Sequence, residues 1–255
     1  MRMTPFVELL NIRRHHGHPV VPDPRRANVA EAFRGRPRLA AGNCDGCGRC
    51  LAVCPSGAIT TAPLRIDLGR CVFCGDCQAV CPAGAIVFTN AHRLATTRRA
   101  DLILDGSTPP EADSPVTPLE PALRRLFGRS LKLRQVSAGG CNGCEWELNA
   151  SGNVNFDIGR YGIEFVASPR HADGVVITGP VSANMAAALE DTLRAVPAPR
   201  LVIAAGSCAI SGGVFAASPA LDRMFFERHP VDLFIPGCPP HPLTVIDGIV
   251  RLLGR

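Results

Sequence analysis

Two cysteine-rich loops constrain the fold of this 255-residue chain more than any other feature. Eight of its 12 cysteines occur in two runs that share the spacing Cys-x2-Cys-x2-Cys-x3-Cys-Pro. The first run contains Cys44, Cys47, Cys50 and Cys54, and the second contains Cys71, Cys74, Cys77 and Cys81. A short loop with this spacing aims successive thiolates at one point, so each run predicts a metal-binding segment.

This spacing is typical of bacterial two-cluster ferredoxins, in which the fourth cysteine of each run ligates the other [4Fe–4S] cluster. The expected ligand sets are therefore crossed: Cys44, Cys47, Cys50 and Cys81 for the first cluster, and Cys71, Cys74, Cys77 and Cys54 for the second. Zinc knuckles are the alternative, but they need no crossing and usually contain separated CxxC pairs. Ligand-type spacing without a signal peptide also argues against disulfides and for a reducing compartment.

Residues 36–92 are expected to form a small ferredoxin-like module with an internal repeat, because Cys54–Ile59 matches Cys81–Ile86. Residues 1–35 are predicted to form a short apolar helix followed by a proline-rich basic docking arm. A solvated tail is the alternative to docking on a partner or an anionic membrane surface. Residues 93–130 are predicted to be a linker, because proline, acidic and small polar residues are frequent there.

Residues 131–255 predict an open, mainly parallel, flavodoxin-like α/β domain. Short strand-like runs occur at residues 162–166, 174–178, 201–205 and 231–235, and apolar residues recur at helical spacing over 182–196 and 242–253. Strands that alternate with helices are typical of parallel sheets. The expected fold class is therefore α/β, with an α+β module that binds two [4Fe–4S] clusters at its amino-terminal end.

The four remaining cysteines lie in loops of this α/β domain. Cys208 and Cys238 each follow a predicted strand, and the carboxyl ends of parallel strands converge in space. Cys141 and Cys144 come from a glycine-rich loop, so four thiolates meeting at one point predict a third [4Fe–4S] cluster. Small buried core residues are the alternative. Glycines that would let backbone N–H groups approach the sulfurs are Gly139, Gly140, Gly206, Gly212, Gly213 and Gly237.

The charge balance gives no support to nucleic-acid binding. The formal net charge is +5, but each [4Fe–4S]²⁺ cluster with four thiolates adds about −2, which brings a three-cluster protein to about −1. No window reaches the roughly 20 apolar residues that span a bilayer. Arg13 and Arg14 are followed by a histidine-rich stretch rather than an apolar one, so we expect no export signal and a cytoplasmic protein.

Four motifs in the second half carry a family resemblance. They are Gly139-Gly140-Cys141-Asn142-Gly143-Cys144-Glu145, Ser168-Pro169-Arg170-His171-Ala172-Asp173, Gly206-Ser207-Cys208, and Ile235-Pro236-Gly237-Cys238-Pro239-Pro240. Together they resemble the small iron–sulfur subunit (complex I 20 kDa-like) shared by energy-converting group 4 [NiFe]-hydrogenases and respiratory complex I. The cysteine runs, preceded by Phe33-Arg34-Gly35-Arg36-Pro37, resemble the ferredoxin-type subunit of the formate hydrogenlyase and complex I group. The chain thus looks like a fusion of two normally separate subunits.

The resemblance implies a non-catalytic electron-transfer subunit of a membrane-associated, formate hydrogenlyase-like [NiFe]-hydrogenase complex, with three [4Fe–4S] clusters. Complex I small subunits typically carry two adjacent cysteines where this chain has Cys141 and Cys144 separated by two residues, which favours the hydrogenase branch. In this family the nickel site is usually built from two CxxC pairs near opposite ends of one chain. Only one CxxC pair remains here after the ferredoxin runs are assigned, so the nickel site must lie elsewhere. The alternatives are a complex I-like NADH/quinone oxidoreductase module, a freestanding ferredoxin-type carrier, and a complex whose large subunit has lost its metal.

The partners that the resemblance implies are a large subunit with the nickel–iron site, membrane-anchor subunits, and a soluble electron donor such as a formate dehydrogenase or ferredoxin. These partners would hold the chain peripherally on the cytoplasmic face of the inner membrane. By the same resemblance, Glu145 would assist proton transfer, with an interface salt bridge or hydrogen bond as the alternative. Arg170 and His171 would lie near the third cluster and tune its potential, with an ordinary turn as the alternative.

Overall fold

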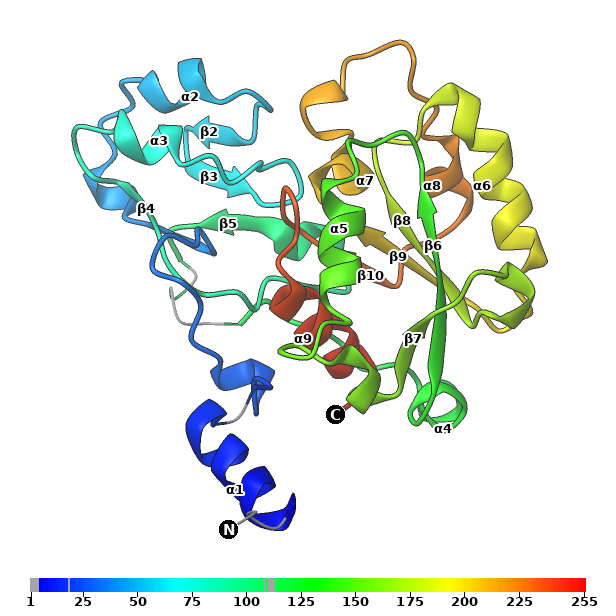
Figure 1. Cartoon of the computed structure of the whole chain (residues 1–255). Helices are drawn as coiled ribbons and strands as arrows, with labels where there is room; N and C mark the ends of the chain where they lie inside the picture. Colours follow the sequence, from blue (N-terminus) through cyan, green and yellow to red (C-terminus); the bar gives the residue numbers. More distant parts are fainter. Residues whose placement is uncertain (1–4, 18, 108, 110–112) are drawn as a thin grey trace.

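The computed structural model describes residues 5–17, 19–107, 109 and 113–255, so His18 and part of the predicted linker lie outside the described residues. Figure 1 shows a small module next to a larger α/β domain, with the amino-terminal helix α1 (Pro5–His16) projecting away from both. None of the residues of α1 is buried.

The small module contains two antiparallel sheets. Strand β1 (Pro37–Leu39) pairs with β4 (Ile86–Phe88), and β3 (Leu64–Asp67) lies between β2 (Ile59–Thr61) and β5 (Ile103–Asp105). Two short helices, α2 (Arg49–Val53) and α3 (Asp76–Ala79), pack together. The first sheet joins the two ends of the cysteine-containing segment, which closes the module into an α+β unit.

The larger domain is built on a five-stranded parallel sheet. Its strands are β6 (Leu131–Ser137), β7 (Ile163–Phe165), β8 (Gly174–Thr178), β9 (Leu201–Ala205) and β10 (Leu233–Ile235). They lie in the order β10-β9-β8-β6-β7. Numbered along the chain this order is 2-1-3-4-5, the flavodoxin-like arrangement. The fold class predicted from the sequence is confirmed, and β6 is a strand that the sequence analysis did not identify.

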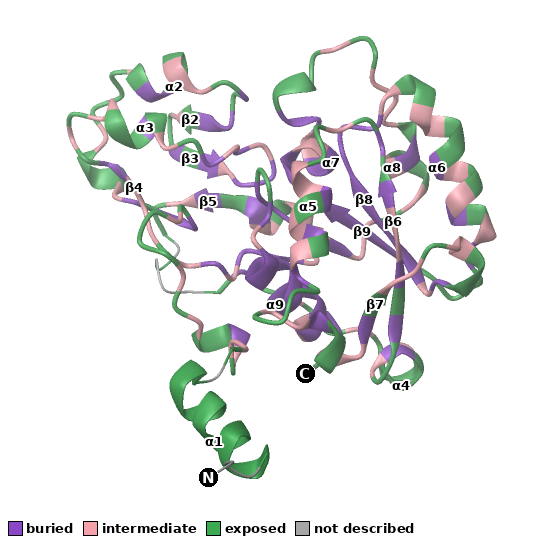
Figure 2. Ribbon diagram, in the orientation of Figure 1, coloured by how far each residue is buried: buried purple, intermediate pink, exposed green. Residues whose placement is uncertain are grey.

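Helices cover both faces of this sheet, as Figure 1 shows. Helices α5 (Gly143–Ala150) and α9 (Pro242–Leu252) pack on one face, and α6 (Ala183–Ala195) and α8 (Met224–Arg228) pack on the other. Every residue of β8 and β9 is buried, as expected for central strands of a sheet that is covered twice. Figure 2 shows this burial as a continuous band through the domain.

The segment predicted to be a linker carries regular structure at several points. Strand β5 belongs to the module's sheet, and Thr96 exchanges two backbone hydrogen bonds with Phe234 on the free edge of β10. Helix α4 (Pro121–Phe127) places Phe127 in the core of the α/β domain, where it is 2% exposed. Residues 93–107 and 113–130 therefore bind both parts of the chain.

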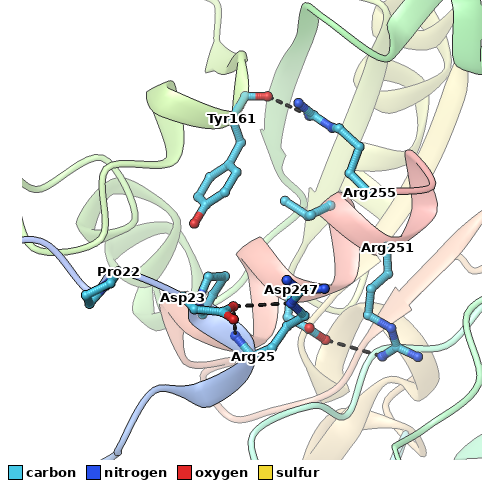
Figure 3. A pocket seen from close by; sticks show the side chains of 9 residues that line it. Pro22, Asp23, Arg25, Tyr161, Asp247, Arg251 and Arg255 are labelled. Carbon is cyan, nitrogen blue, oxygen red and sulfur yellow. Dashed lines mark hydrogen bonds and ion pairs between the residues drawn. The ribbon is translucent and has the colours of Figure 1, made fainter.

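The basic arm lies along the α/β domain near α9. Val21 N donates to Asn155 O (2.8 Å). His92 Nε2 lies 2.7 Å from Pro24 O, and Pro24 is buried. A cavity of about 420 Å³ separates the arm from Tyr161 and the end of α9 (Figure 3). The arginines that line this cavity already interact with other groups of the chain, for example Arg251 in an ion pair with Asp247. Within the described residues, no helix is long and apolar enough to cross a membrane.

The burial of Phe127 predicts a large effect of a substitution in α4. We expect Phe127→Ala to lower the free energy of unfolding by about 3–5 kcal/mol, because it leaves a cavity in the core. Leu126→Ala is the matched control, since Leu126 is 56% exposed, and its effect should stay within about 0.5 kcal/mol. Thermal unfolding followed by far-UV circular dichroism measures both. Equal unfolding temperatures for the two variants would contradict the packing of α4.

Candidate iron–sulfur sites

The first predicted site draws cysteines from both runs. Burial raises the pKa of the Cys50 thiol, and the nearby thiols of Cys44 and Cys81 raise it further. Cys81 belongs to the second run, so the structure brings the predicted crossing cysteine to this site. Cys47 is exposed on the same loop, where its N–H donates to Asp45 Oδ1 (3.0 Å).

The second predicted site shows the same crossing in the opposite direction. Cys54 from the first run lines one cavity with Cys71, Cys74 and Cys77. Burial raises the pKa of Cys71 to about 12 and that of Cys77 to about 11, and the neighbouring thiols add to both shifts. Burial thus favours the neutral thiols of Cys71 and Cys77, and binding of iron displaces the protons.

The internal repeat explains how the crossing sulfurs are oriented. Ala58 N donates to Cys54 Sγ and Ala85 N donates to Cys81 Sγ, each at 3.3 Å and four residues along the chain. The residue before each of these alanines is a glycine. Gly57 and Gly84 have φ values of +59° and +58°, a left-handed conformation that glycine adopts without strain. Hydrogen bonds to cluster sulfurs are one means by which a protein sets the potential of a cluster.

The third predicted site lies at the carboxyl edge of the parallel sheet. A cavity of about 110 Å³ is lined by four cysteines, Cys141, Cys144, Cys208 and Cys238. Burial raises the pKa of Cys144, and Glu145 and the other three cysteines raise it further. Four soft thiolates around one cavity fit the donor set of a [4Fe–4S] cluster. Among the described residues, no group of three or more His, Cys, Asp or Glu side chains is arranged to hold a single metal ion.

The backbone passes very close to the third site at Gly206. Its φ is +90°, and a Cβ at this position would lie 2.5 Å from Cys144 Sγ. The loop after β9 can therefore pass the sulfur only without a side chain. Of the four cysteines, Cys141 and Cys238 are exposed, whereas Cys144 and Cys208 are partly buried, so the cavity has an outer and an inner side.

Glu145 lies beside this cavity and is 7% exposed. Thr178, at the end of β8, donates from Oγ1 to Glu145 Oε1 (2.6 Å). The adjacent Trp146 is 75% exposed, and burial raises the pKa of Glu147. The carboxyl group of Glu145 is therefore fixed by the sheet rather than free in solvent.

Arg170 and His171 do not lie where the sequence analysis expected them. Both belong to a 3₁₀ helix (Pro169–His171) without buried residues that precedes β8, at the amino-terminal end of that strand. The cysteines of the third site follow the carboxyl ends of the strands, so the structure does not bring these two residues to the site. An arginine that does contact the site is Arg223, with Nη1 3.2 Å from Cys208 O. No motif or spacing in the sequence marks Arg223.

The second and third sites are joined by one buried hydrogen bond. Ser207, which precedes Cys208, donates from Oγ to Cys71 O (2.5 Å) and is 1% exposed. Around it, Ala209 and Ile210 belong to the same buried cluster as Cys71 and Cys77. The ferredoxin-like module and the α/β domain therefore share one core at this point.

Two family models match separate parts of the chain. The model of the 20 kDa subunit family of NADH ubiquinone oxidoreductase matches residues 141–252, and that of the 4Fe–4S dicluster domain matches residues 43–85. The first match includes the four cysteines of the third site, and the second includes both cysteine runs.

Curated relatives come from hydrogenase and respiratory complexes. A probable membrane-bound hydrogenase subunit of Pyrococcus furiosus is 39% identical over 52% of this chain and 80% of its own length. Formate hydrogenlyase subunit 7 of Escherichia coli is 36% identical over 57% of each chain. A subunit of the NADH-quinone oxidoreductase of Desulfovibrio desulfuricans is 40% identical over 56% of this chain and 76% of its own length.

The contact at Gly206 predicts selective damage to the third site. We expect Gly206→Ala to displace Cys144 Sγ and to remove about four irons per chain, the content of one cluster. Gly159→Ala is the control, because a Cβ there would meet nothing closer than Asp157 Oδ1 at 3.7 Å. Iron analysis after anaerobic purification measures both variants. Full iron content in Gly206→Ala would exclude a cluster in contact with this loop.

Proposed function

Because this chain belongs to the family of the 20 kDa subunit of NADH ubiquinone oxidoreductase, we propose that it is the electron-transfer subunit of a multisubunit, [NiFe]-hydrogenase-like complex. It relays electrons through three [4Fe–4S] clusters to or from a partner large subunit and has no catalytic site of its own. The ligands of the third cluster are Cys141, Cys144, Cys208 and Cys238, and the two crossed sets of the ferredoxin module hold the others.

The hydrogen bond between Ser207 and Cys71 is the observation that carries this proposal. It connects the backbone of a ligand of the second cluster to the residue next to Cys208, a ligand of the third. Electrons therefore pass between the module and the α/β domain within one chain. The exposed Cys47 is a ligand of the first cluster, so this cluster exchanges electrons with the donor or acceptor at the outer end of the chain of clusters.

The exposed side of the third site supports the position of the large subunit. Cys141 and Cys238 are exposed, and Trp146 is exposed next to Glu145 in α5. We propose that the large subunit, with its nickel–iron site, covers this side. Membrane-anchor subunits hold the complex peripherally on the cytoplasmic face of the membrane, and a formate dehydrogenase or ferredoxin supplies electrons. The division into an arm (1–35), a module (36–92), a linker (93–130) and a domain (131–255) belongs to the same proposal.

The metal content of the purified complex tests this function. We expect anaerobic affinity purification with its partners to yield nickel in equal amount to this chain, with about twelve irons attributable to its three clusters. Iron without nickel would contradict the hydrogenase assignment and favour the quinone-linked module or a large subunit without metal. A stable monomer with no partners would favour a freestanding carrier.

A role of Glu145 in proton transfer is a separate part of the proposal. Glu145→Gln keeps an oxygen that accepts the hydrogen bond from Thr178, but the amide cannot release a proton at neutral pH. We expect it to lower hydrogen evolution by the complex about 10²–10⁴-fold, with unchanged iron content and unfolding temperature. Glu164→Gln, on the exposed side of β7, is the control. Wild-type activity in Glu145→Gln would leave this carboxylate with a structural role alone.

A further inference from the structure

Arg223 is a cation that contacts the backbone of Cys208, on the inner side of the third site. It lies between α7 (Ser207–Ser211) and α8, and its guanidinium donates four hydrogen bonds to backbone carbonyls. Nη1 donates to Pro180 O (3.1 Å) and Cys208 O (3.2 Å), and Nη2 donates to Ala209 O (2.8 Å) and Ile210 O (3.1 Å). One side chain thus ties the loop after β8 to the helix that carries Cys208.

These contacts satisfy the carboxyl end of α7. The last carbonyls of a helix have no partner within the helix. A basic side chain at this end can donate hydrogen bonds to them and interacts favourably with the negative end of the helix dipole. The guanidinium also lies over the ring of Phe226, 4.9 Å from its centroid. Packing on the ring and four hydrogen bonds hold the positive charge in one place.

The charge of Arg223 is not compensated by a carboxylate. Among the described residues, the ion pairs join other cations, such as Arg99 with Asp67 and Arg228 with Glu190, and none includes Arg223. Arg223 is partly buried. A charge without a counterion in a partly buried position is less screened by solvent than one at the surface.

We propose that Arg223 is a positioning residue that raises the reduction potential of the third cluster by holding a fixed positive charge beside Cys208. This inference rests on the proposed function, because it requires a cluster on the four cysteines. On reduction, one electron passes from the second cluster to the third, and the charge of the third cluster with its four thiolates changes from about −2 to about −3. A nearby cation stabilises the more negative form, so it favours acceptance of the electron.

Geometry gives the direction of this effect. Nη1 of Arg223 lies 3.2 Å from Cys208 O, on the backbone of a proposed cluster ligand. A cation held at this place favours the reduced over the oxidised cluster. The sequence predicts such a role for Arg170, but Arg223 occupies the position that the role requires.

Potentiometric titration of the wild-type complex and its variants, followed by electron paramagnetic resonance, tests the inference. We expect Arg223→Gln to shift the reduction equilibrium of the third cluster about tenfold toward the oxidised form, ~59 mV for a one-electron step. Arg223→Lys should keep most of the wild-type potential, because it keeps the charge. Arg200→Gln is the matched control, since Arg200 also donates to a backbone carbonyl, Val196 O at 3.1 Å, but at the amino-terminal end of β9.

The outcomes separate this inference from the proposed function. A wild-type complex with no third cluster signal would overturn both. A third signal with the same potential in wild type, Arg223→Gln and Arg223→Lys would overturn the role of Arg223 and leave the electron-transfer function intact. If Arg223→Gln loses the cluster, Arg223→Lys decides: a potential close to wild type supports the charge effect, and a tenfold shift contradicts it.

Discussion

The loop after β9 packs against the second cysteine run, and most of the other features of the molecule depend on this contact. Ala209 and Ile210 of the α/β domain belong to the same buried hydrophobic cluster as the core residues of the module. Ser207 Oγ donates a hydrogen bond to Cys71 O. A module of this size buries only a small core, so its stability is marginal without further contacts or cofactors. The α/β domain supplies part of that core, and the same contact brings two cysteine sites from different halves of the chain together.

The sequence was sufficient to predict the residues whose chemistry depends on spacing. Local patterns predict the crossed cysteines, the third group of cysteines and four of the five strands. In the structure Cys54 lines a cavity with cysteines of the second run, the third group lines one cavity, and the strands pair in one sheet. Strand β6 was missed because Leu131, Leu133 and Val136 alternate irregularly with charged and polar residues. The contacts of the predicted linker with the rest of the chain could not be predicted, because contacts such as that of Thr96 with Phe234 are made through the backbone. Arg223 could not be found because its partners are carbonyl groups, which leave no pattern in a sequence.

The two halves of the ferredoxin repeat differ at one informative position. Gly46 has a φ of +73°, and its counterpart in the second run is Phe73, with a φ of +56°. A left-handed conformation costs a bulky residue roughly 1–2 kcal/mol, but Phe73 is 8% exposed and contacts Phe88. Burial of such a ring contributes about 1.5–3 kcal/mol, so packing offsets the strain. The second run therefore occupies an interior position at Phe73, whereas the first forms an open glycine loop at Gly46.

The unequal exposure of the third group of cysteines has a consequence for assembly. Cys144 and Cys208 are partly buried, whereas Cys141 and Cys238 are exposed. Under the proposed function, dissolved oxygen and chelators can reach the exposed half of this site until the large subunit docks. Docking would then act as a seal, and the order in which subunits associate would become a condition for keeping the iron.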